Sequence, residues 1–506
     1  MNVLYILGGI IVWGVIIGLT FLFVLPKGRI YDKTIKEWDK KSTYTTYIIA
    51  AVLIAVCVIP MGMNPMWNGE IVEHRDQYEK MAEAILNGHL YLDCEVDPNL
   101  LAMANPYDPA ARDELGVTYQ WDHAFYNGHY YMYFGVVPVF LLFLPFRIIT
   151  GCALTTYHAT QIFVALFIIG MFRLFYAFAR KFFDELPQAL YWIMCVAFCS
   201  ISVWFSIGSP ALYCTAITSG LCLEIWSIYF FFKAVWENYT LNRKIMFAFV
   251  GALLGAGAFG CRPTVALANI LVIPMLVVFI KEHKMSAKLF GKLCIAASPY
   301  LVIGALLMIY NMVRFDSPFE FGQAYQLTVA DQTAYSDVKI TDDLAKAVNV
   351  VLHNMFDIGE FTNDFPWVTT GGALINFSIL FVPFAILFNS RIRAMLKENR
   401  LVGLVGFMII VPVIVSIMEG LWSPFLLERY HLDIYWIMSI LSFLVLGYIY
   451  KDNMESKVMT RVIAMWGFLM FIKCILFCLY PSEANYVSVY PEALENIKSI
   501  VSFGIK

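Results

Sequence analysis

One residue suited to proton transfer, Asp76, stands just after an apolar run near the start of a long polar segment. A carboxylate held at the boundary between lipid and water is partly desolvated, and it can take a proton from a hydroxyl group. Asp76 also stands where the N-cap of a following helix belongs, a role that would stabilise the helix by about 1 kcal/mol. The sequence leaves both roles open.

Three arginines stand at the ends of apolar runs: Arg262, Arg314 and Arg429. A cation at membrane depth is costly, so it usually has an anionic partner. A guanidinium matches the geometry of a phosphate group with two parallel hydrogen bonds. The three residues are therefore candidates for a phosphate site. The alternatives are side chains that reach out to the interface, or a structural pair of Arg429 with Glu428.

Aromatic and polar residues crowd two stretches of the same polar segment, Trp121–His123 and Tyr126–Gly135. Asn127-Gly128 between alternating residues predicts a short hairpin. Many Tyr and His side chains would suit sugar stacking or contact with lipid headgroups, although an ordinary interfacial aromatic belt has the same composition. The candidate substrate-contacting residues are His74, Asp122, His123, Tyr131, Tyr430 and His431.

The sequence gives little sign of a metal or cofactor site. It contains no HExxH, no His pair four residues apart, no P-loop and no nucleophile elbow, so we expect no cofactor. A divalent ion near His74, His123 and His129 is the open alternative. The 11 cysteines form no CxxC pair, and most lie in apolar runs.

The composition requires lipid as the solvent for these groups. Hydrophobic residues make up 60% of the 506, and 14% are charged, whereas soluble domains carry about 25% charged residues. We expect an all-α, polytopic transmembrane bundle of about twelve spans. The net charge of −3 gives no general attraction for nucleic acid. The expected spans are 3–24, 45–63, 156–179, 188–207, 210–235, 245–261, 264–280, 293–312, 371–389, 401–420, 431–450 and 461–480.

The basic loops fix the expected orientation. Segment 25–44 carries six Lys and Arg residues and is therefore predicted to be cytoplasmic. Every later basic loop also falls inside if the run 133–150, which Pro138, Pro145 and Arg147 interrupt, lies in the interface as an interfacial or re-entrant helix. No basic residue precedes the run 2–25, so it reads as a retained span.

This assignment gathers the long loops on the outer face. The chain then divides into an extra span with its basic loop (1–44), a transmembrane core (45–312) with a first outer loop (64–155), a second outer loop (313–370), C-terminal spans (371–480) and an outer tail (481–506). Within the first loop, the spacing of Tyr78, Met81, Ala82, Ile85 and Leu86 predicts an amphipathic surface helix that stops at Gly88.

The chain resembles the GT-C superfamily of polytopic glycosyltransferases, which take sugars from polyprenyl-phosphate donors. The resemblance lies in the architecture and in three stretches: the acidic site with Glu73 and Asp76, the end of the surface helix at 87–93, and Tyr126–Gly135 followed by an interfacial helix. The stretch 314–322 also resembles bacterial members. The chain departs from the usual pattern by its extra first span and by the lack of a large soluble C-terminal domain.

The resemblance implies a function. Asp76 would serve as the catalytic base, with Glu73 in reserve, and Arg262, Arg314 and Arg429 would hold the donor phosphate. The enzyme would move a hexosyl or pentosyl group to a glycan, glycolipid or protein of the cell envelope, at the outer face of a bacterial plasma membrane. Glu73 and Asp76 form no DxD pair, which puts a metal requirement in doubt.

Three other interpretations compete. A secondary transporter or a flippase for lipid-linked oligosaccharides should place ionisable residues near mid-membrane, whereas most charges here cluster at the ends of spans. A polymerase or ligase of the O-antigen type would share the outer face but use a different loop. A purely structural role would not need three arginines at one interface.

Overall fold

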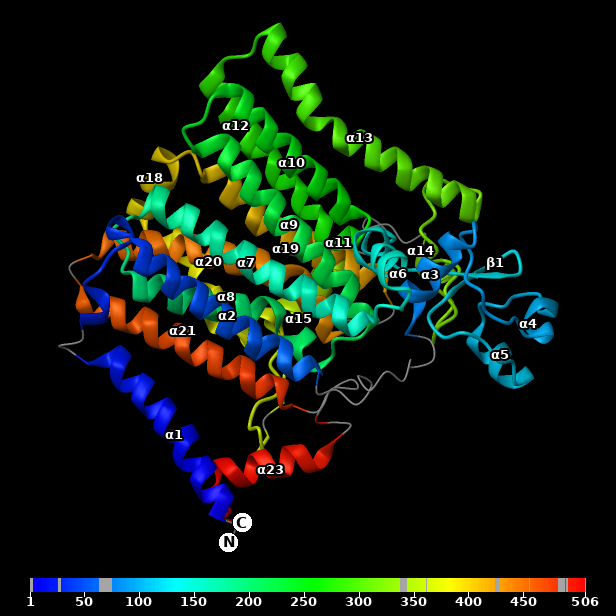
Figure 1. Cartoon of the computed structure of the whole chain (residues 1–506), viewed down its shortest axis with the longest axis horizontal. Helices are drawn as coiled ribbons and strands as arrows, with labels where there is room; N and C mark the ends of the chain where they lie inside the picture. The colour runs from blue at the N-terminus through cyan, green and yellow to red at the C-terminus, as the bar shows by residue number, and fades with distance from the viewer. Residues whose placement is uncertain are drawn as a thin grey trace.

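Long apolar helices dominate the computed structural model, which describes residues 3–25, 29–62, 75–336, 344–360, 362–423, 427–454, 456–480, 487 and 490–505. Within these ranges, 11 helices are long and apolar enough to cross a membrane, and a bent pair brings the number to 12. The predicted all-α polytopic fold is confirmed (Figure 1). The spans are α1 (Val3–Val24), α2 (Lys40–Gly62), α7 (Thr156–Phe182), α8 (Gln188–Gly208), α9 (Leu212–Trp236), α10 (Leu241–Phe259), the run of α11 (Pro263–Ala266), η5 (Leu267–Leu271) and α12 (Val272–His283), then α13 (Ala287–Phe315), α19 (Val402–Leu421), α20 (His431–Asp452) and α21 (Lys457–Cys478).

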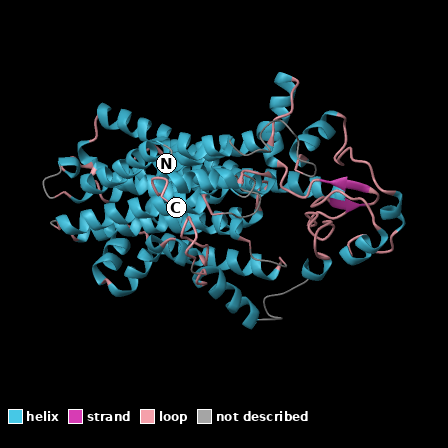
Figure 2. Cartoon of the chain, turned by 90° about the horizontal axis from the view of Figure 1, so that it is seen from below, coloured by secondary structure: helices cyan, strands magenta, loops and turns pink. Residues whose placement is uncertain are grey.

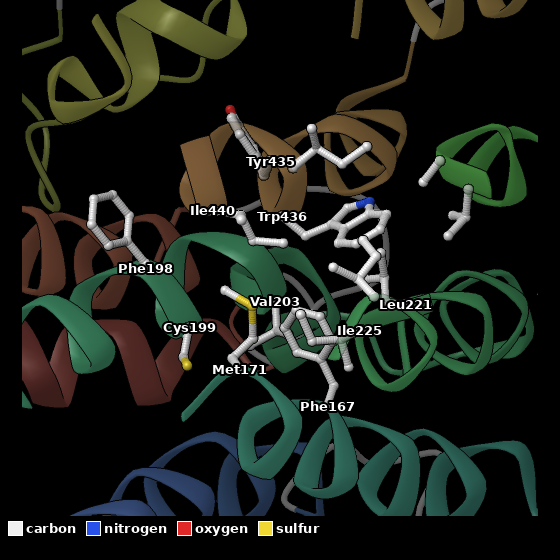
Figure 3. Close-up of a cluster of buried hydrophobic side chains, with 14 of the residues drawn as sticks. Phe167, Met171, Phe198, Cys199, Val203, Leu221, Ile225, Tyr435, Trp436 and Ile440 are labelled. Atoms are coloured by element: carbon white, nitrogen blue, oxygen red, sulfur yellow. The ribbon is translucent and has the colours of Figure 1, made fainter. Parts of the chain in front are cut away.

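The core of the bundle forms around α20, in which nearly every residue is buried. Its Trp436 and Ile440 lie among Phe167 of α7, Val203 of α8 and Ile225 of α9 (Figure 3). By contrast, α1 and α13 expose most of their apolar side chains. Such surfaces are suited to lipid, so these two helices line the outside of the bundle.

The basic loops meet at one end of the bundle. The backbone N–H of Ile35, in the short helix η2 (Ile35–Glu37) that follows η1 (Arg29–Tyr31), donates to the carbonyl of Leu186 at 2.9 Å. Lys451 donates to the carbonyl of Phe182 at 3.0 Å. At the other end, Asp122 in the first long loop donates its N–H to Leu327 in the second at 2.9 Å. The two classes of loop are therefore separated, as the charge pattern predicts.

The expected span 371–389 is wrong as a single helix. The structure breaks this run into α16 (Ala373–Asn376), η6 (Ser378–Phe384) and α17 (Ala385–Phe388), and then bends by 88° into α18 (Ser390–Glu398). Pro383 cannot donate within a helix. The side chain of Asn389 caps α18 by accepting from the N–H groups of Arg391 and Ile392, which ends the apolar run and starts a new helix.

The interrupted run 133–150 is predicted to be one interfacial or re-entrant helix, and the structure forms a short helix over Val139–Thr150. The π-helical η4 (Val139–Phe143) has 5 residues and leads directly into α6 (Leu144–Thr150), which has 7. Together they form one continuous apolar element. At about 1.5 Å per residue it reaches about 18 Å, too short for a hydrocarbon layer of about 30 Å.

The predicted surface helix is α3 (Gln77–Leu86), and it ends before Gly88, which has a positive φ of 87°. Tyr78, Met81 and Ala82 are buried, and Tyr78 stacks on Phe143 of η4 with 5.0 Å between ring centroids. Leu86 does not share this face, because it is 50% exposed. The apolar side of α3 packs on protein, which locks the first loop to the bundle.

The loop-rich end contains the predicted hairpin, formed by β1 (Ala124–Tyr126) and β2 (His129–Tyr131) with positive φ at Asn127 and Gly128 (Figure 2). Residue Gln326 of the second loop bridges to Ala124, so the two loops fold together. The remaining short helices of the two loops and of the turn before α20 are α4 (Pro98–Ala102), α5 (Pro109–Leu115), α14 (Thr333–Ser336), α15 (Leu344–Phe356) and η7 (Glu428–Tyr430).

The first and last helices pack on each other, beside the bundle (Figure 1). The hydroxyl of Tyr5 in α1 donates to Asn496 in α23 (Pro491–Val501) at 2.8 Å, and Trp13 donates to the carbonyl of Val501 at 2.9 Å.

The separation of the loops predicts the outcome of cysteine labelling. In a background with the exposed Cys152 and Cys294 changed to Ser, Asn99→Cys at the loop-rich end should react with an impermeant maleimide added to intact cells. Lys397→Cys, at the basic end, should react only after the membrane is opened, because basic loops stay in the cytoplasm. The reverse pattern would contradict the predicted orientation.

Candidate functional site

The loop-rich end of the bundle encloses a cavity of about 670 Å³. Its walls come from the ends of α9, α10, α13 and α19 at this end of the bundle, from η7, and from the segment 121–136 of the first loop. Because these span ends form its walls, the cavity lies at the level where the bundle leaves the membrane. All three predicted arginines, Arg262, Arg314 and Arg429, line it together with Asp122 and Tyr430.

Arg262 already has an anionic partner. Its Nε lies 2.7 Å and 2.9 Å from the two carboxylate oxygens of Asp433 in α20, whose side chain is fully buried. The hydroxyl of Thr264 donates to the same carboxylate at 2.6 Å. The pair neutralises the charge that a guanidinium would otherwise carry at this depth. Arg262 is therefore a structural cation first, and it ties the start of α11 to α20.

Arg314 is held without a carboxylate within 4 Å among the described residues. It donates to the carbonyl of Met132 and to the side chain of Asn311, both at 2.8 Å, and it stacks on Tyr310 at 3.8 Å from the ring centroid. Neutral partners and a ring face fix its position but leave its charge uncompensated. This geometry suits a cation that waits for an anionic ligand.

Arg429 and Asp122 both contact Tyr213, Arg429 at the ring and Asp122 at the hydroxyl group. The Arg429 guanidinium lies 4.1 Å from the centre of the Tyr213 ring. The Tyr213 hydroxyl donates to one carboxylate oxygen of Asp122, and the amide of Gln326 donates to the other at 3.1 Å. A carboxylate has about four acceptor positions, so two remain for a ligand. Asp122 has φ of 55°, and its N–H bond to Leu327 holds it there.

A close backbone approach joins the first loop to the spans. The N–H of Val137 donates to the carbonyl of Gly260 at 2.9 Å. A Cβ on Gly135 would collide with the carbonyl groups of Gly260 and Cys261. Only glycine permits this approach, and Gly135 and Gly260 both line the cavity. Next to them, burial raises the pKa of Tyr133 to about 12, so its hydroxyl stays protonated at neutral pH.

Asp76 does not line this cavity in the described part of the chain. Its carboxylate lies 3.0 Å from Lys80 and borders a smaller cavity of about 270 Å³ beside α3 and α6. The side chain also accepts no hydrogen bond from the N–H groups of α3, so Asp76 precedes the helix without capping it. The ion pair with Lys80, one turn along, takes the place of the cap. The neighbouring Arg75, in contrast, lines the large cavity.

Glu79 is the most perturbed group of the smaller cavity. One of its oxygens accepts the N–H of Thr156 at 3.0 Å, at the start of α7. The other oxygen is buried and has no hydrogen-bond partner among the described residues. Burial raises the pKa of Glu79 to about 8, with the nearby Asp76 adding to the effect. Glu79 thus joins α3 to α7 as a carboxyl group that is largely protonated at neutral pH.

The remaining predicted residues lie elsewhere. His123 is fully buried with its Nδ1 2.8 Å from the carbonyl of Trp121, and Tyr131 packs on Phe315 at 5.3 Å between ring centroids. His431 Nε2 lies 2.7 Å from Asn354 of α15, which in turn donates to Ser416 of α19. These three side chains face protein behind the cavity wall, because each completes a buried contact between elements. Glu73 and His74 lie outside the described residues.

Metal ligands do not gather in the described ranges, where no three His, Cys, Asp or Glu side chains stand together as a possible ion site. His129 is exposed on the hairpin and stacks on Tyr91 at 4.3 Å, away from His123.

Sequence reasoning did not select Tyr213, Gln326, Glu419 or Asp433, although each lines the large cavity or holds one of its charges. Glu419 and Asp433 do carry the signal that selected the arginines, since they stand at the ends of apolar runs. Tyr213 and Gln326 carry no such signal. They belong to the site because they donate hydrogen bonds to Asp122, and those contacts arise only in the folded chain.

The Glu79 geometry predicts a pH effect on stability. The group ionises near pH 4.5 in the unfolded chain but near pH 8 in the folded protein. Its contribution to stability is complete below pH 4.5 and is lost as the pH rises to 8, because only the unfolded state releases the proton in that range. The melting temperature of Glu79→Gln minus that of the wild type should therefore increase from pH 5 to pH 8. A constant difference would contradict the buried, protonated carboxyl group.

Comparison with known proteins finds similarity in structure alone. No protein-family model and no curated protein matches the sequence. The crystal structure of the oligosaccharyltransferase of Archaeoglobus fulgidus with zinc and sulfate is similar, with a TM-score of 0.42 and 13% identity over 88% of this chain and 53% of that chain. The same protein tethered to an acceptor peptide with the NVT sequon gives 0.40 and 12% over 92% and 56%, and its apo form gives 0.39 and 13% over 92% and 56%. The chain spans about half the length of the oligosaccharyltransferase that it matches.

Proposed function

We propose that this protein is a GT-C type glycosyltransferase that moves a sugar from a polyprenyl-phosphate donor to a cell-envelope acceptor at the outer membrane face. The observation that carries the proposal is the cavity in which Arg314, Arg429 and Asp122 meet at the ends of the spans. This combination offers cations for a phosphate and a carboxylate for a hydroxyl proton. The resemblance of the first-loop stretches to that superfamily points to the same reaction.

The position of the cavity suits a donor with a lipid tail. Phe259 at the end of the apolar helix α10 lines the cavity and is 42% exposed. It contacts Phe321 of the second loop at 5.9 Å between ring centroids. Leu307 and Tyr310 of the peripheral helix α13 continue this wall. A phosphate in the cavity could therefore keep its hydrocarbon chain in the bilayer.

The charges divide the work of the reaction. Because Asp433 neutralises Arg262, the phosphate role falls to Arg314 and Arg429. As the donor's bond between the anomeric carbon and the phosphate oxygen breaks, its electron pair stays on the phosphate. The two guanidinium groups stabilise this developing charge without supplying a proton. Arg262 serves the site by fixing α11 against α20.

Asp122 is the carboxylate that best fits the role of base. The acceptor hydroxyl attacks the anomeric carbon through its oxygen and gives its proton to Asp122, which retains free acceptor positions. The family resemblance implies this role for Asp76, with Glu73 in reserve. Asp76 borders the other cavity and is paired with Lys80, so the geometry favours Asp122.

Two isosteric variants separate the candidates for the base. Asp122→Asn should lower the transfer of radiolabelled sugar from decaprenyl-phosphate donors to membrane acceptors by at least about a hundredfold, because a general base typically contributes that much. Asp76→Asn should retain activity within a few-fold. Both proteins should elute as single species from size-exclusion chromatography. Collapse of Asp76→Asn with an active Asp122→Asn would return the base to Asp76.

The phosphate site has its own test, which does not depend on the identity of the sugar. Arg314→Gln and Arg429→Gln should each weaken binding of decaprenyl phosphate to the protein in nanodiscs by about tenfold or more, because each removes a charge-assisted contact. Arg391→Gln, on the opposite end of the bundle, is the matched control and should bind normally. Normal binding by both cavity variants would rule out the proposed phosphate site.

A further inference from the structure

The wall of the cavity beside Arg262 carries a second carboxyl group, Glu419, in the last turn of α19. Its side chain is 4% exposed. Both of its oxygens are buried, and neither has a hydrogen-bond partner among the described residues. A buried carboxylate without donors costs several kcal/mol. The carboxyl group of Asp433 and the guanidinium of Arg262 are its charged neighbours. A ligand that donates a hydrogen bond from the cavity would complete the site.

Arg262 does not satisfy Glu419. The Nη2 atom of Arg262 lies 3.8 Å from Glu419 Oε1, which is too long for a hydrogen bond. The Nε atom is committed to Asp433 at 2.7 Å. One guanidinium thus faces two carboxyl groups, and its charge is matched by the nearer one. The uncompensated group is the one that faces the cavity.

Glu419 lies on a different part of the wall from the arginines of the phosphate site. The Tyr430 ring is near both parts, with the Arg262 guanidinium 5.4 Å and the Arg429 guanidinium 5.6 Å from its centre. A ligand whose phosphate lies at Arg429 would extend past Tyr430 toward Glu419. The part of a glycosyl phosphate next to the phosphate is its sugar ring, and every such ring offers hydrogen-bond donors.

We infer that Glu419 is a sugar-recognition residue that accepts a hydrogen bond from a ring hydroxyl or an ammonium group of the transferred sugar. The inference rests on the proposed function, because it assumes that the phosphate of the same ligand lies at Arg314 and Arg429. The cavity then binds the sugar-bearing lipid at two points. The arginines bind its phosphate, and Glu419 accepts a hydrogen bond from its sugar. Glu419 forms no covalent bond and determines which sugars bind.

Binding of three lipids by the full chain in nanodiscs tests this assignment. The probes are decaprenyl phosphate, decaprenyl phosphate bearing a hexose, and the same lipid bearing an aminohexose. For the wild type, at least one sugar-bearing lipid should bind more tightly than the bare lipid phosphate. Glu419→Gln should bind bare decaprenyl phosphate normally but lose about fivefold or more of the gain from the sugar, because a neutral acceptor makes a weaker hydrogen bond than a carboxylate.

The two sugar arms distinguish the donor group. If an ammonium group is the partner, Glu419→Gln should lower the affinity for the aminohexose lipid more than the affinity for the hexose lipid. The neutral amide no longer forms an ion pair with the ammonium group. If a hydroxyl group is the partner, the two losses are similar. Glu419→Ala should remove the gain completely. Glu282→Gln, at the opposite end of the bundle beside Lys244, is the control and should behave as the wild type.

Each other outcome has a defined meaning. If Glu419→Gln and Glu419→Ala still bind the sugar-bearing lipid more tightly than bare decaprenyl phosphate by the wild-type factor, the inference is overturned. The proposed phosphate site is not affected by that result. An equal loss for bare decaprenyl phosphate also overturns it, because Glu419 would then only shape the cavity. A wild type that binds no decaprenyl phosphate contradicts the proposed function, and the inference fails with it.

Discussion

The ion pair between Arg262 and Asp433 is the interaction on which the site is built. A guanidinium at the edge of the membrane is tolerated only with an anionic partner, and the partner here comes from the central helix α20. Thr264 completes the contact, so the start of α11 is fixed to the most buried helix of the bundle. The last turn of α19 lies against the same arginine through Glu419. Three spans therefore end in register around one cavity.

With Arg262 neutralised, the cavity has walls of opposite character. Arg314 is held by a carbonyl, an amide and a ring, none of which cancels its charge. Glu419 is held beside an arginine that belongs to another acid. A fold optimised for stability alone would pair such groups or replace them with apolar residues. Their separation across a shared cavity is what a polar ligand with an anionic end would require.

Local signals in the sequence specify most of the fold but only part of the site. Long apolar runs predict the spans, Asn127-Gly128 predicts the hairpin, and the positions of the basic loops predict that the interrupted run 133–150 does not cross the membrane. The run 371–389 fails because hydropathy does not register the break that Pro383 and the cap of Asn389 impose. Arginines at the ends of spans are recognisable because an unpaired cation is costly at that depth. The sequence does not rank Asp122 above Asp76, because Asp122 is distinguished by its contact with Tyr213 of α9, whereas Asp76 pairs with Lys80 one turn along.

A hydrogen-bonded polar group also lies inside the bundle, where a count of charged residues at the span ends does not reveal it. Glu224 lies in α9, where it accepts from Asn269 at 2.5 Å, and Tyr300 donates to Asn269 at 2.5 Å. This chain of hydrogen bonds joins α9, η5 and α13 inside the bundle. It resembles the buried polar groups that a transporter would need, yet each described link holds neighbouring helices together. The structure gives it a cohesive role.

The contact between α1 and α23 has a consequence for biosynthesis. Tyr5 and Asn496 are 491 positions apart in the chain, so α1 meets α23 only after the residues between them have been made. Until then α1 presents an almost bare apolar surface to lipid. The cavity can form during this interval, because no residue of α23 is among its described lining residues. The contact between α1 and α23 then forms as a late step of maturation.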